Sequence, residues 1–138
     1  MSRWMGIDVG GQSLKAVLVE ESGAVTKHAT RPSGREATLR DLATAIGEVA
    51  NELGHERGRA IGVGVAGCVT LGGIVRGSPN LPALAGSAIE RDLGGALGVR
   101  VVADNDAHCH ALAEAWIGAA RRTSTFLLIT LGSGIGSG

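Results

Sequence analysis

The sequence predicts an α/β domain with a mixed five-stranded sheet flanked by helices, and two observations carry this prediction. The first is an N-terminal set of three short runs, separated by tight turns, in which residue polarity alternates. Such runs are typical of an antiparallel meander of strands. The second is the rest of the chain, where segments of helical periodicity alternate with short apolar runs. This alternation is typical of units that add strands to a sheet and place helices on its faces.

The first three strands are each justified by their pattern. An apolar run begins at Arg3 and ends before a pair of glycines. In the second run Leu14, Ala16 and Leu18 fall on one face, which is the period of a strand. A turn, Glu-Ser-Gly, leads to the third run. The expected strands span 3–9, 13–20 and 24–30.

The elements that follow alternate between helix and strand. Apolar residues recur at about 3.6-residue spacing over 36–53, and Gly54 is placed to end that helix. Gly98 closes a second helix over 87–97 in the same way, and a third is expected over 107–120. The expected strands are 60–66, 99–103 and 126–131, with a small hairpin at 67–75 and a rigid loop at 78–82.

Size and charge exclude some classes of protein. A chain of 138 residues is typical of one domain. Lys and Arg together number 13, as do Asp and Glu, so the basic excess of a general polyanion binder is absent. The aromatic residues are Trp4, Trp116 and Phe126, too few for a base-stacking module or an aromatic sugar platform. We therefore expect no nucleic-acid partner.

Cysteine content and hydropathy indicate the compartment. Cys68 and Cys109 are the two cysteines, so no disulfide framework follows. The start, MSRWMGIDVGG, lacks the apolar stretch of a signal peptide. No run approaches the roughly 20 apolar residues of a membrane helix. We expect a cytoplasmic protein with no membrane partner.

The first candidate site is the stretch from Asp8 to Lys15. Asp8 ends a strand beside Gly10 and Gly11, where the missing Cβ atoms allow backbone N–H groups to approach a phosphate. The carboxylate would hold Mg²⁺ through water, and Lys15 would add positive charge. The alternative is a plain hairpin turn with an exposed acid and lysine.

A second glycine-rich stretch, GSGIGSG over 132–138, directly follows an apolar strand. It is a candidate phosphate cradle, although a dinucleotide fingerprint also requires a following helix. The alternative is a flexible tail.

The third candidate is Asp104-Asn105-Asp106, where a strand gives way to a helix. Acids at a helix start are stabilised by the helix dipole and free N–H groups, so Asp104 is expected as the N-cap. Two acids are more than capping requires, and α/β proteins bind ligands where strands end. The nearby His108 and His110 point about 200° apart on a helix, which argues against a shared metal.

The three stretches occur in one order, and together they resemble the ROK family (repressors, open reading frames and kinases) of bacterial sugar kinases, including its glucokinase-like members. The resemblance rests on GIDVGGQSLK, on GVGVAGCV leading to GSPNLP, on VVADNDAHCHALAEAWIGAAR and on LITLGSGIGSG. It implies an actin-like (ribonuclease H-like) fold of two lobes, with ATP, Mg²⁺ and a hexose in the cleft. The implied reaction transfers the phosphoryl group of ATP to a sugar hydroxyl.

The resemblance also implies roles for single residues. Asp106 matches the catalytic base, and Asn105 matches a sugar-binding amide. Asn80 and the backbone at Gly67 match positions that approach the sugar. The implied phosphate-binding residues are Asp8, Gly10, Gly11 and Lys15 in the first motif, and Gly132, Ser133 and Gly134 in the second.

Some features depart from the family. Its members usually have Thr at the position of Gln12 and Asn at that of His108, and GQSLK leans towards the FGGY carbohydrate kinases, which share the fold. Members run to roughly twice this length, since a second lobe closes the cleft. The zinc motif of that lobe and its sugar-contacting His and Glu are missing. We therefore expect residues 1–123 to form an N-terminal lobe and 124–138 to begin a second one.

The leading hypothesis is the N-terminal half of an ATP-dependent hexose kinase, inactive alone because closure of two lobes is absent. One alternative is the sugar-sensing module of a ROK-type transcriptional regulator. Regulators carry a helix-turn-helix before the first motif, and its start at Asp8 favours a kinase. Another alternative is a truncated product that self-associates through the apolar strand 126–131, and we expect a homo-oligomer. The sugar stays open among glucose, N-acetylated hexosamines, fructose and allose.

Overall fold

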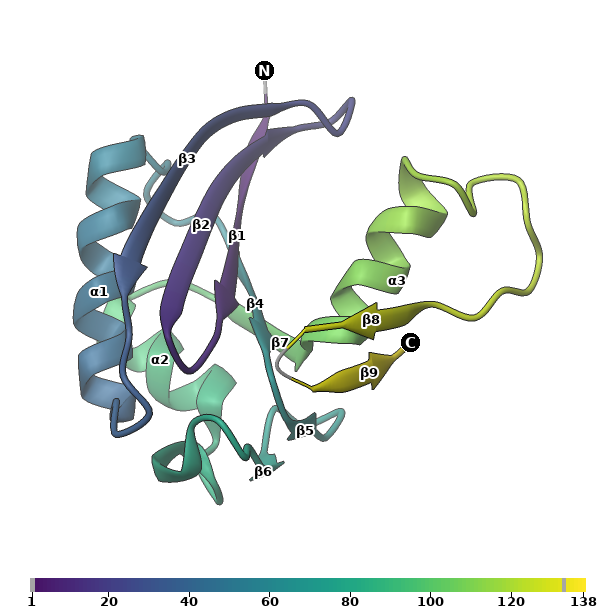
Figure 1. The fold of residues 1–138 in the computed structure, drawn as a ribbon. Coiled ribbons are helices and arrows are strands. Elements are labelled where there is room, and N and C mark those ends of the chain that lie inside the picture. The colour runs from purple at the N-terminus through teal and green to yellow at the C-terminus, as the bar shows by residue number, and fades with distance from the viewer. Residues whose placement is uncertain (1, 133) are drawn as a thin grey trace.

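The computed structural model describes residues 2–132 and 134–138, which fold around a mixed five-stranded sheet (Figure 1). Its strands, in spatial order, are β3 (Val25–Pro32), β2 (Ser13–Glu20), β1 (Arg3–Val9), β4 (Ile61–Val65) and β7 (Val101–Asn105). The pairs β1–β2 and β2–β3 are antiparallel, whereas β4 pairs parallel with both β1 and β7. The predicted meander, the mixed sheet and the flanking helices are confirmed.

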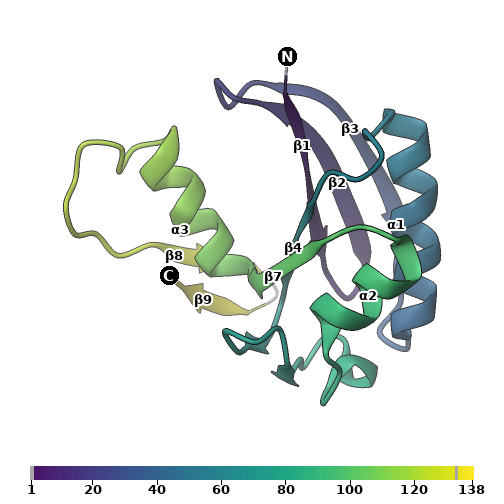
Figure 2. The same ribbon diagram turned by 180° about the vertical axis from the view of Figure 1, so that it is seen from behind.

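Two helices, α1 (Leu39–Leu53) and α2 (Ile89–Leu97), cover one face of the sheet (Figures 1 and 2). The alternating residues of the strands supply the other half of this core, as strand geometry requires. The buried strand residues on this face are Met5, Ile7, Val9, Leu14, Ala16, Leu18, Ile61, Val63, Val65, Val101 and Ala103. The core therefore lies on one side of the sheet and leaves the other side to a different element.

The helix ends follow local rules. A capping box starts α1, in which the Asp41 backbone N–H donates to Thr38 Oγ1 at 3.3 Å and the Thr38 N–H donates to Asp41 Oδ2 at 2.8 Å. This box explains why the helix begins at Leu39 and not at the predicted position 36. Gly54 and Gly98 end α1 and α2 in the left-handed conformation, with φ of 74° and 67°, as predicted.

The third helix, α3 (Asp106–Trp116), lies on the opposite side of the sheet from α1 and α2 (Figures 1 and 2). It approaches the sheet at Gly64, where an added Cβ would lie 3.5 Å from both the Asp106 Cα and the Cys109 Sγ. The predicted end at residue 120 is wrong, because the chain turns off after Trp116. Ala107 is the one buried side chain of α3, so most of its apolar surface stays exposed.

Smaller elements complete the fold. They are the hairpin β5 (Cys68–Val69) with β6 (Val75–Gly77), the 3₁₀ turn Pro82–Leu84, and the hairpin β8 (Ile129–Leu131) with β9 (Ile135–Ser137). The strand predicted over 126–131 starts only at Ile129, although backbone bonds between Leu128 and Gly138 extend its ladder. A Cβ on Gly136 would lie 3.2 Å from the Ala107 Cβ, so β9 lies directly against α3.

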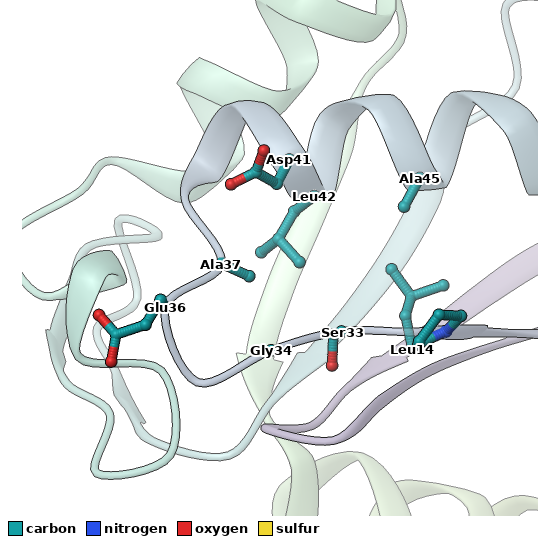
Figure 3. A pocket seen from close by; sticks show the side chains of 9 residues that line it. Leu14, Ser33, Gly34, Glu36, Ala37, Asp41, Leu42 and Ala45 are labelled. Carbon is teal, nitrogen blue, oxygen red and sulfur yellow. The ribbon is translucent and has the colours of Figure 1, made fainter.

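A cavity of about 320 Å³ lies between α1, β2 and the segment that joins β3 to α1 (Figure 3). Leu42 and Ala45 of α1 face Leu14 across it, while the Glu36 side chain points away from them. None of the residues predicted to bind substrate lines this cavity. Within the described part of the chain, no helix has the length and apolarity to cross a bilayer.

Candidate active site at the carboxyl ends of the parallel strands

Asp8 lies on the face of the sheet that α1 and α2 leave free. Its register partners are Lys15 on β2 and Gly64 on β4, and Gly64 in turn pairs with Asp104 on β7. Because register partners share a face, these four residues form one row across the sheet. The first turn of α3 packs on Gly64, so it brings Asp106 beside this row. Two predicted residues that are about a hundred positions apart in sequence thus meet at one place.

The charges around Asp8 fit a cation. Burial, followed by the negative charge of Asp106, raises the pKa of Asp8 above its ordinary value of 3.8, while His110 and Lys15 act to lower it. Two carboxylates that repel each other in partial burial are stabilised by a divalent cation. Carboxylate oxygens are also the protein ligands that Mg²⁺ prefers. The donor set therefore suits Mg²⁺ held at Asp8.

The junction between β7 and α3 corrects one prediction. Asn105, not Asp104, is the N-cap: its Oδ1 accepts from the backbone N–H groups of Ala107 at 2.9 Å and His108 at 3.2 Å. Asp104 instead accepts from the Asn105 N–H at 2.7 Å and pairs with the His108 ring at 3.1 Å. Asp106 is consequently the first residue of α3.

Asn105 is also fixed by a tertiary bond. Its Nδ2 donates to the Gly67 carbonyl oxygen at 2.8 Å. Both ends of the amide are thus engaged, and among the residues that the structure describes one N–H of Nδ2 has no further partner. Asn105 can therefore offer a ligand a donor but has its oxygen already committed.

Gly67 sits in a tight place. A Cβ there would collide with the Gly77 carbonyl oxygen and would come within 3.0 Å of the Ser78 Cβ. Ser78 is buried, and its hydroxyl donates to the Ala66 carbonyl at 2.8 Å. The segment before β5 (Ala66 and Gly67) thus packs tightly against the end of β6 and Ser78.

Asn80 and the loop between β1 and β2 are in contact. A Cβ on Gly11 would lie 2.9 Å from the Asn80 carbonyl oxygen and 3.0 Å from its Cβ. The structure therefore requires glycine at position 11 for packing between two loops, a reason that differs from the predicted approach of a phosphate. Ser33 supports the same loop, because its hydroxyl donates to the Gly10 carbonyl and its N–H to the Gln12 carbonyl.

The second glycine stretch follows β8 and includes β9. The Gly132 N–H donates to the Gly134 carbonyl at 2.9 Å, while Ser133 lies outside the described residues. A Cβ at Gly132 or Gly134 would meet nothing within 4 Å. Packing within this chain therefore does not demand glycine at either position.

Of the other candidates, Lys15 is exposed beside Asp8, and Cys109 is half-buried on the sheet side of α3. Burial, followed by the charges of Asp104, Asp106 and Asp8, raises the pKa of the Cys109 thiol. Among residues 2–132 and 134–138, no three His, Cys, Asp or Glu side chains converge in a metal-binding group.

Two residues near the site were not predicted as parts of it, although His110 was considered as a metal ligand. His110 is four positions after Asp106, so the two share a helix face, and this spacing was a usable signal. Ser33 had no such signal, because its role depends on contact with a loop more than 20 positions earlier.

The charge state of Asp8 gives a testable pH dependence. A pKa raised by folding means that the contribution of Asp8 to stability is fully present below 3.8 and is lost as pH rises through the folded-state value. Asp8→Asn is therefore expected to raise the free energy of unfolding at pH 7 by up to about 1 kcal/mol, after allowance for solvent screening. The gain should vanish near pH 3. Urea unfolding of both proteins across this range measures it.

Asp41→Asn is the matched control, because hydrogen bonds from Thr38 lower the pKa of Asp41. This variant should therefore be less stable than wild type at pH 7, the opposite sign to Asp8→Asn. A loss of stability in Asp8→Asn at pH 7 would contradict the electrostatic account of the site.

Comparison with known proteins places this geometry in a family. The sequence matches the ROK family over residues 4–138. It is 35% identical to a glucokinase of Thermotoga maritima, over 97% of this chain and 43% of that protein. The fold is similar to that of an inorganic polyphosphate/ATP-glucomannokinase from an Arthrobacter species, with a TM-score of 0.89, 32% identity and coverage of 99% and 57%.

A ROK family glucokinase from Streptomyces griseus, solved with glucose and AMPPNP, is also similar, with a TM-score of 0.87 and 27% identity. The match covers 99% of this chain and 43% of that one. The chain thus spans about half the length of the relatives that it matches. The motif order, the sheet topology and these matches agree, and the chain belongs to the ROK family.

Proposed function

We propose that this chain is the N-terminal half of an ATP-dependent hexose kinase, in which Asp106 is the catalytic base. The observation that carries the proposal is that Asp106 and Asp8 both lie next to Gly64. The side-chain amide of Asn105, which donates to the Gly67 carbonyl, lies beside them. Phosphoryl transfer needs a positioned nucleophile and neutralised phosphate charge, and little covalent chemistry from the protein. A cation-binding acid in this row and a base beside it meet this need. The relatives named glucokinase and glucomannokinase are consistent with it.

The sugar would lie over the junction of β7 and α3. Asn105 offers the remaining N–H of its amide to a sugar oxygen, since its other atoms are engaged. Asn80 lies on the neighbouring loop, against Gly11, and supplies a second polar side chain. Gly67 acts through its carbonyl, which holds Asn105 in place. A polar set of this kind suits a substrate that consists of hydroxyl groups.

The phosphates would lie over the loop between β1 and β2. Gly10 and Gly11 belong to this loop, Lys15 lies on the strand that follows it, and Asp8 would hold Mg²⁺ through water. Gly132 and Gly134 have open space where side chains would be, which leaves room for a ligand to approach their backbone. Ser133 completes this second motif in the proposal.

Bound Mg-ATP would supply the phosphoryl group and neutralise its charge. Asp106 accepts the proton of the sugar hydroxyl as that oxygen bonds to the γ-phosphorus, and the bond from this phosphorus to the bridging oxygen of ADP breaks. Asn105 and Asn80 orient the hydroxyl for this attack. The products are a sugar phosphate and ADP, with the proton on Asp106.

We further propose that residues 1–123 form one lobe and that 124–138 begin a second lobe, which closes over the site in the complete enzyme. The share of the relatives that the chain covers supports this division. Closure excludes water from the transferring phosphoryl group, so the isolated chain is expected to bind ligands and not to turn over. The cytoplasm, where ATP is available, is the expected compartment.

A coupled ADP-release assay with a hexose panel tests the function in the complete enzyme. The panel contains glucose, mannose, fructose, allose and N-acetylated hexosamines. Sugar-dependent ADP release is expected for at least one of them. Calorimetric titration of residues 1–138 with Mg-ATP and with the preferred sugar then measures which ligand this half binds. A regulator would bind sugar without releasing ADP, and that result would overturn the kinase proposal.

We also propose that the isolated chain self-associates through an exposed apolar surface formed by α3 and the β8–β9 hairpin. Its exposed side chains are Leu112, Trp116, Phe126, Leu127, Ile129, Leu131 and Ile135. Light scattering is expected to show oligomers that Leu131→Gln weakens. Leu71→Gln is the matched control, since Leu71 is fully exposed in the β5–β6 turn. A monodisperse monomer at high concentration would contradict this proposal.

A further inference from the structure

A carboxylate outside the predicted site reaches the strand that carries the site. Glu90 lies in the first turn of α2, and its Oε1 accepts from the Ala103 backbone N–H at 2.8 Å. Ala103 is in β7, the edge strand of the sheet, two positions before Asn105. An edge strand leaves alternate N–H groups without a neighbouring strand. Glu90 supplies the acceptor that a sixth strand would otherwise provide.

The aliphatic part of the Glu90 side chain is also closely packed. It packs on Gly73 in the β5–β6 turn, where an added Cβ would lie 2.7 Å from the Glu90 Cδ and 2.9 Å from its Cβ. Gly73 has a φ of 71°, which also favours glycine. The Ile89 N–H donates to the Gly73 carbonyl at 2.9 Å, so the backbone joins the same two elements. The Glu90 side chain is thus clamped between the hairpin and β7.

The hairpin that Glu90 contacts also holds the site from its other end. Gly67 directly precedes β5, and its carbonyl accepts from Asn105 Nδ2 at 2.8 Å. The junction of β7 and α3 is therefore fixed at two points, the Ala103 N–H and the Asn105 amide. Both points lead back to the segment 67–75. Because Asp106 directly follows Asn105, these two hydrogen bonds also restrict the position of Asp106.

No ion pair among the described residues accounts for the position of Glu90. In the described part of the chain it belongs to none of the ion pairs, and the neighbouring acid Asp92 pairs with Arg91. A half-buried carboxylate without a cation carries a desolvation cost, which the Ala103 hydrogen bond offsets.

From this geometry we propose that Glu90 is a positioning residue, which fixes the carboxyl end of β7 and thereby the place of Asn105 and Asp106. The inference rests on the proposed function, because it assigns Glu90 to the alignment of that same site. It predicts that loss of the Glu90 acceptor affects the sugar and the base, while the β1–β2 loop keeps its hold on the phosphates.

Glu90→Ala, Glu90→Gln and Asp92→Ala are the variants for the test. Glutamine keeps an acceptor oxygen at nearly the same place, and Asp92→Ala removes the other acid from the first turn of α2. In the complete enzyme, Glu90→Ala should lower kcat about tenfold and raise the KM for the sugar, with the KM for Mg-ATP unchanged. Glu90→Gln should restore most of both values, and Asp92→Ala should match wild type.

Amide hydrogen exchange separates this inference from the proposed function. At Ala103 and Asn105, exchange in Glu90→Ala should be at least about tenfold faster than in wild type, and Glu90→Gln should remain slow. Unchanged exchange overturns the positioning role, whether or not the protein phosphorylates sugar. A purely structural role would reduce the active fraction and leave the sugar KM unchanged, which also overturns it. Faster exchange in Glu90→Ala, combined with a wild-type enzyme that has no kinase activity, would overturn the proposed function alone.

Discussion

Asp106→Asn is expected to lower kcat for sugar phosphorylation by about 10²–10⁴-fold, the usual contribution of a general base. Asparagine has nearly the same shape as aspartate and can remain the first residue of α3, but it cannot accept the hydroxyl proton. The attachment of Asn105 to Gly67 does not involve Asp106, so sugar binding should persist. Steady-state ADP release and calorimetric sugar titration, on the same preparation of the complete enzyme, measure the two effects.

Asp104→Asn is the matched control for this result. Asp104 is the neighbouring acid, but it bonds to the Asn105 N–H and the His108 ring and has no assigned part in the chemistry. Its variant should keep a kcat close to that of wild type. Equal ADP release by Asp106→Asn and wild type would sink the assignment of the base. Equal losses in both variants would indicate that the negative charge of the junction matters, and not a single base.

Gly67→Ala is expected to damage both stability and substrate binding. The added methyl group would collide with the Gly77 carbonyl oxygen, which is backbone and cannot rotate away. Relief of this collision requires a backbone shift, which costs about 1–3 kcal/mol in a well-packed region. The shift would also move the carbonyl that holds Asn105, so the KM for the sugar should rise. Urea unfolding and sugar kinetics measure these effects.

Gly77→Ala is a suitable control, because a Cβ at Gly77 would meet nothing within 4 Å. Both substitutions restrict the unfolded chain equally, an effect that by itself stabilises by about 0.4–1 kcal/mol. Gly77→Ala should therefore be as stable as wild type or slightly more so. If Gly67→Ala were equally stable and bound sugar normally, the proposed support of Asn105 by Gly67 would be wrong.

The sequence predicts most of the fold because its elements obey local rules. The strands over 3–9 and 13–20 are bounded by turns and alternate in polarity, and the structure has them with the predicted limits. Gly54 and Gly98 end their helices as predicted, since glycine adopts the left-handed conformation without strain. The predicted end of α3 at residue 120 was wrong, because it followed the apolar residues past Trp116 and did not use Gly118 as a stop signal.

For the candidate site, the structure tests the interactions of the predicted residues, and several of these interactions were not predicted. Asp104 and Asn105 are both good N-caps by type, so local rules could not choose between them. In the structure Asn105 is the N-cap, and its side chain also bonds to Gly67, which lies 38 positions earlier in the sequence. Gly11 was singled out for the approach of a phosphate, whereas its close packing against Asn80 involves a loop almost 70 positions away.

By itself, the sequence determined the α/β class, the order of the elements and the set of candidate functional residues. Periodicity, capping and turn propensity act over a few neighbouring residues, so they can be read from the sequence. Only the tertiary structure decided how those residues meet. Sheet register places Asp8 beside Gly64, and the absence of a side chain at Gly64 lets α3 bring Asp106 to the same row. The role of Glu90 likewise arises from an edge strand that has no partner, a property of the assembled sheet and of no local segment.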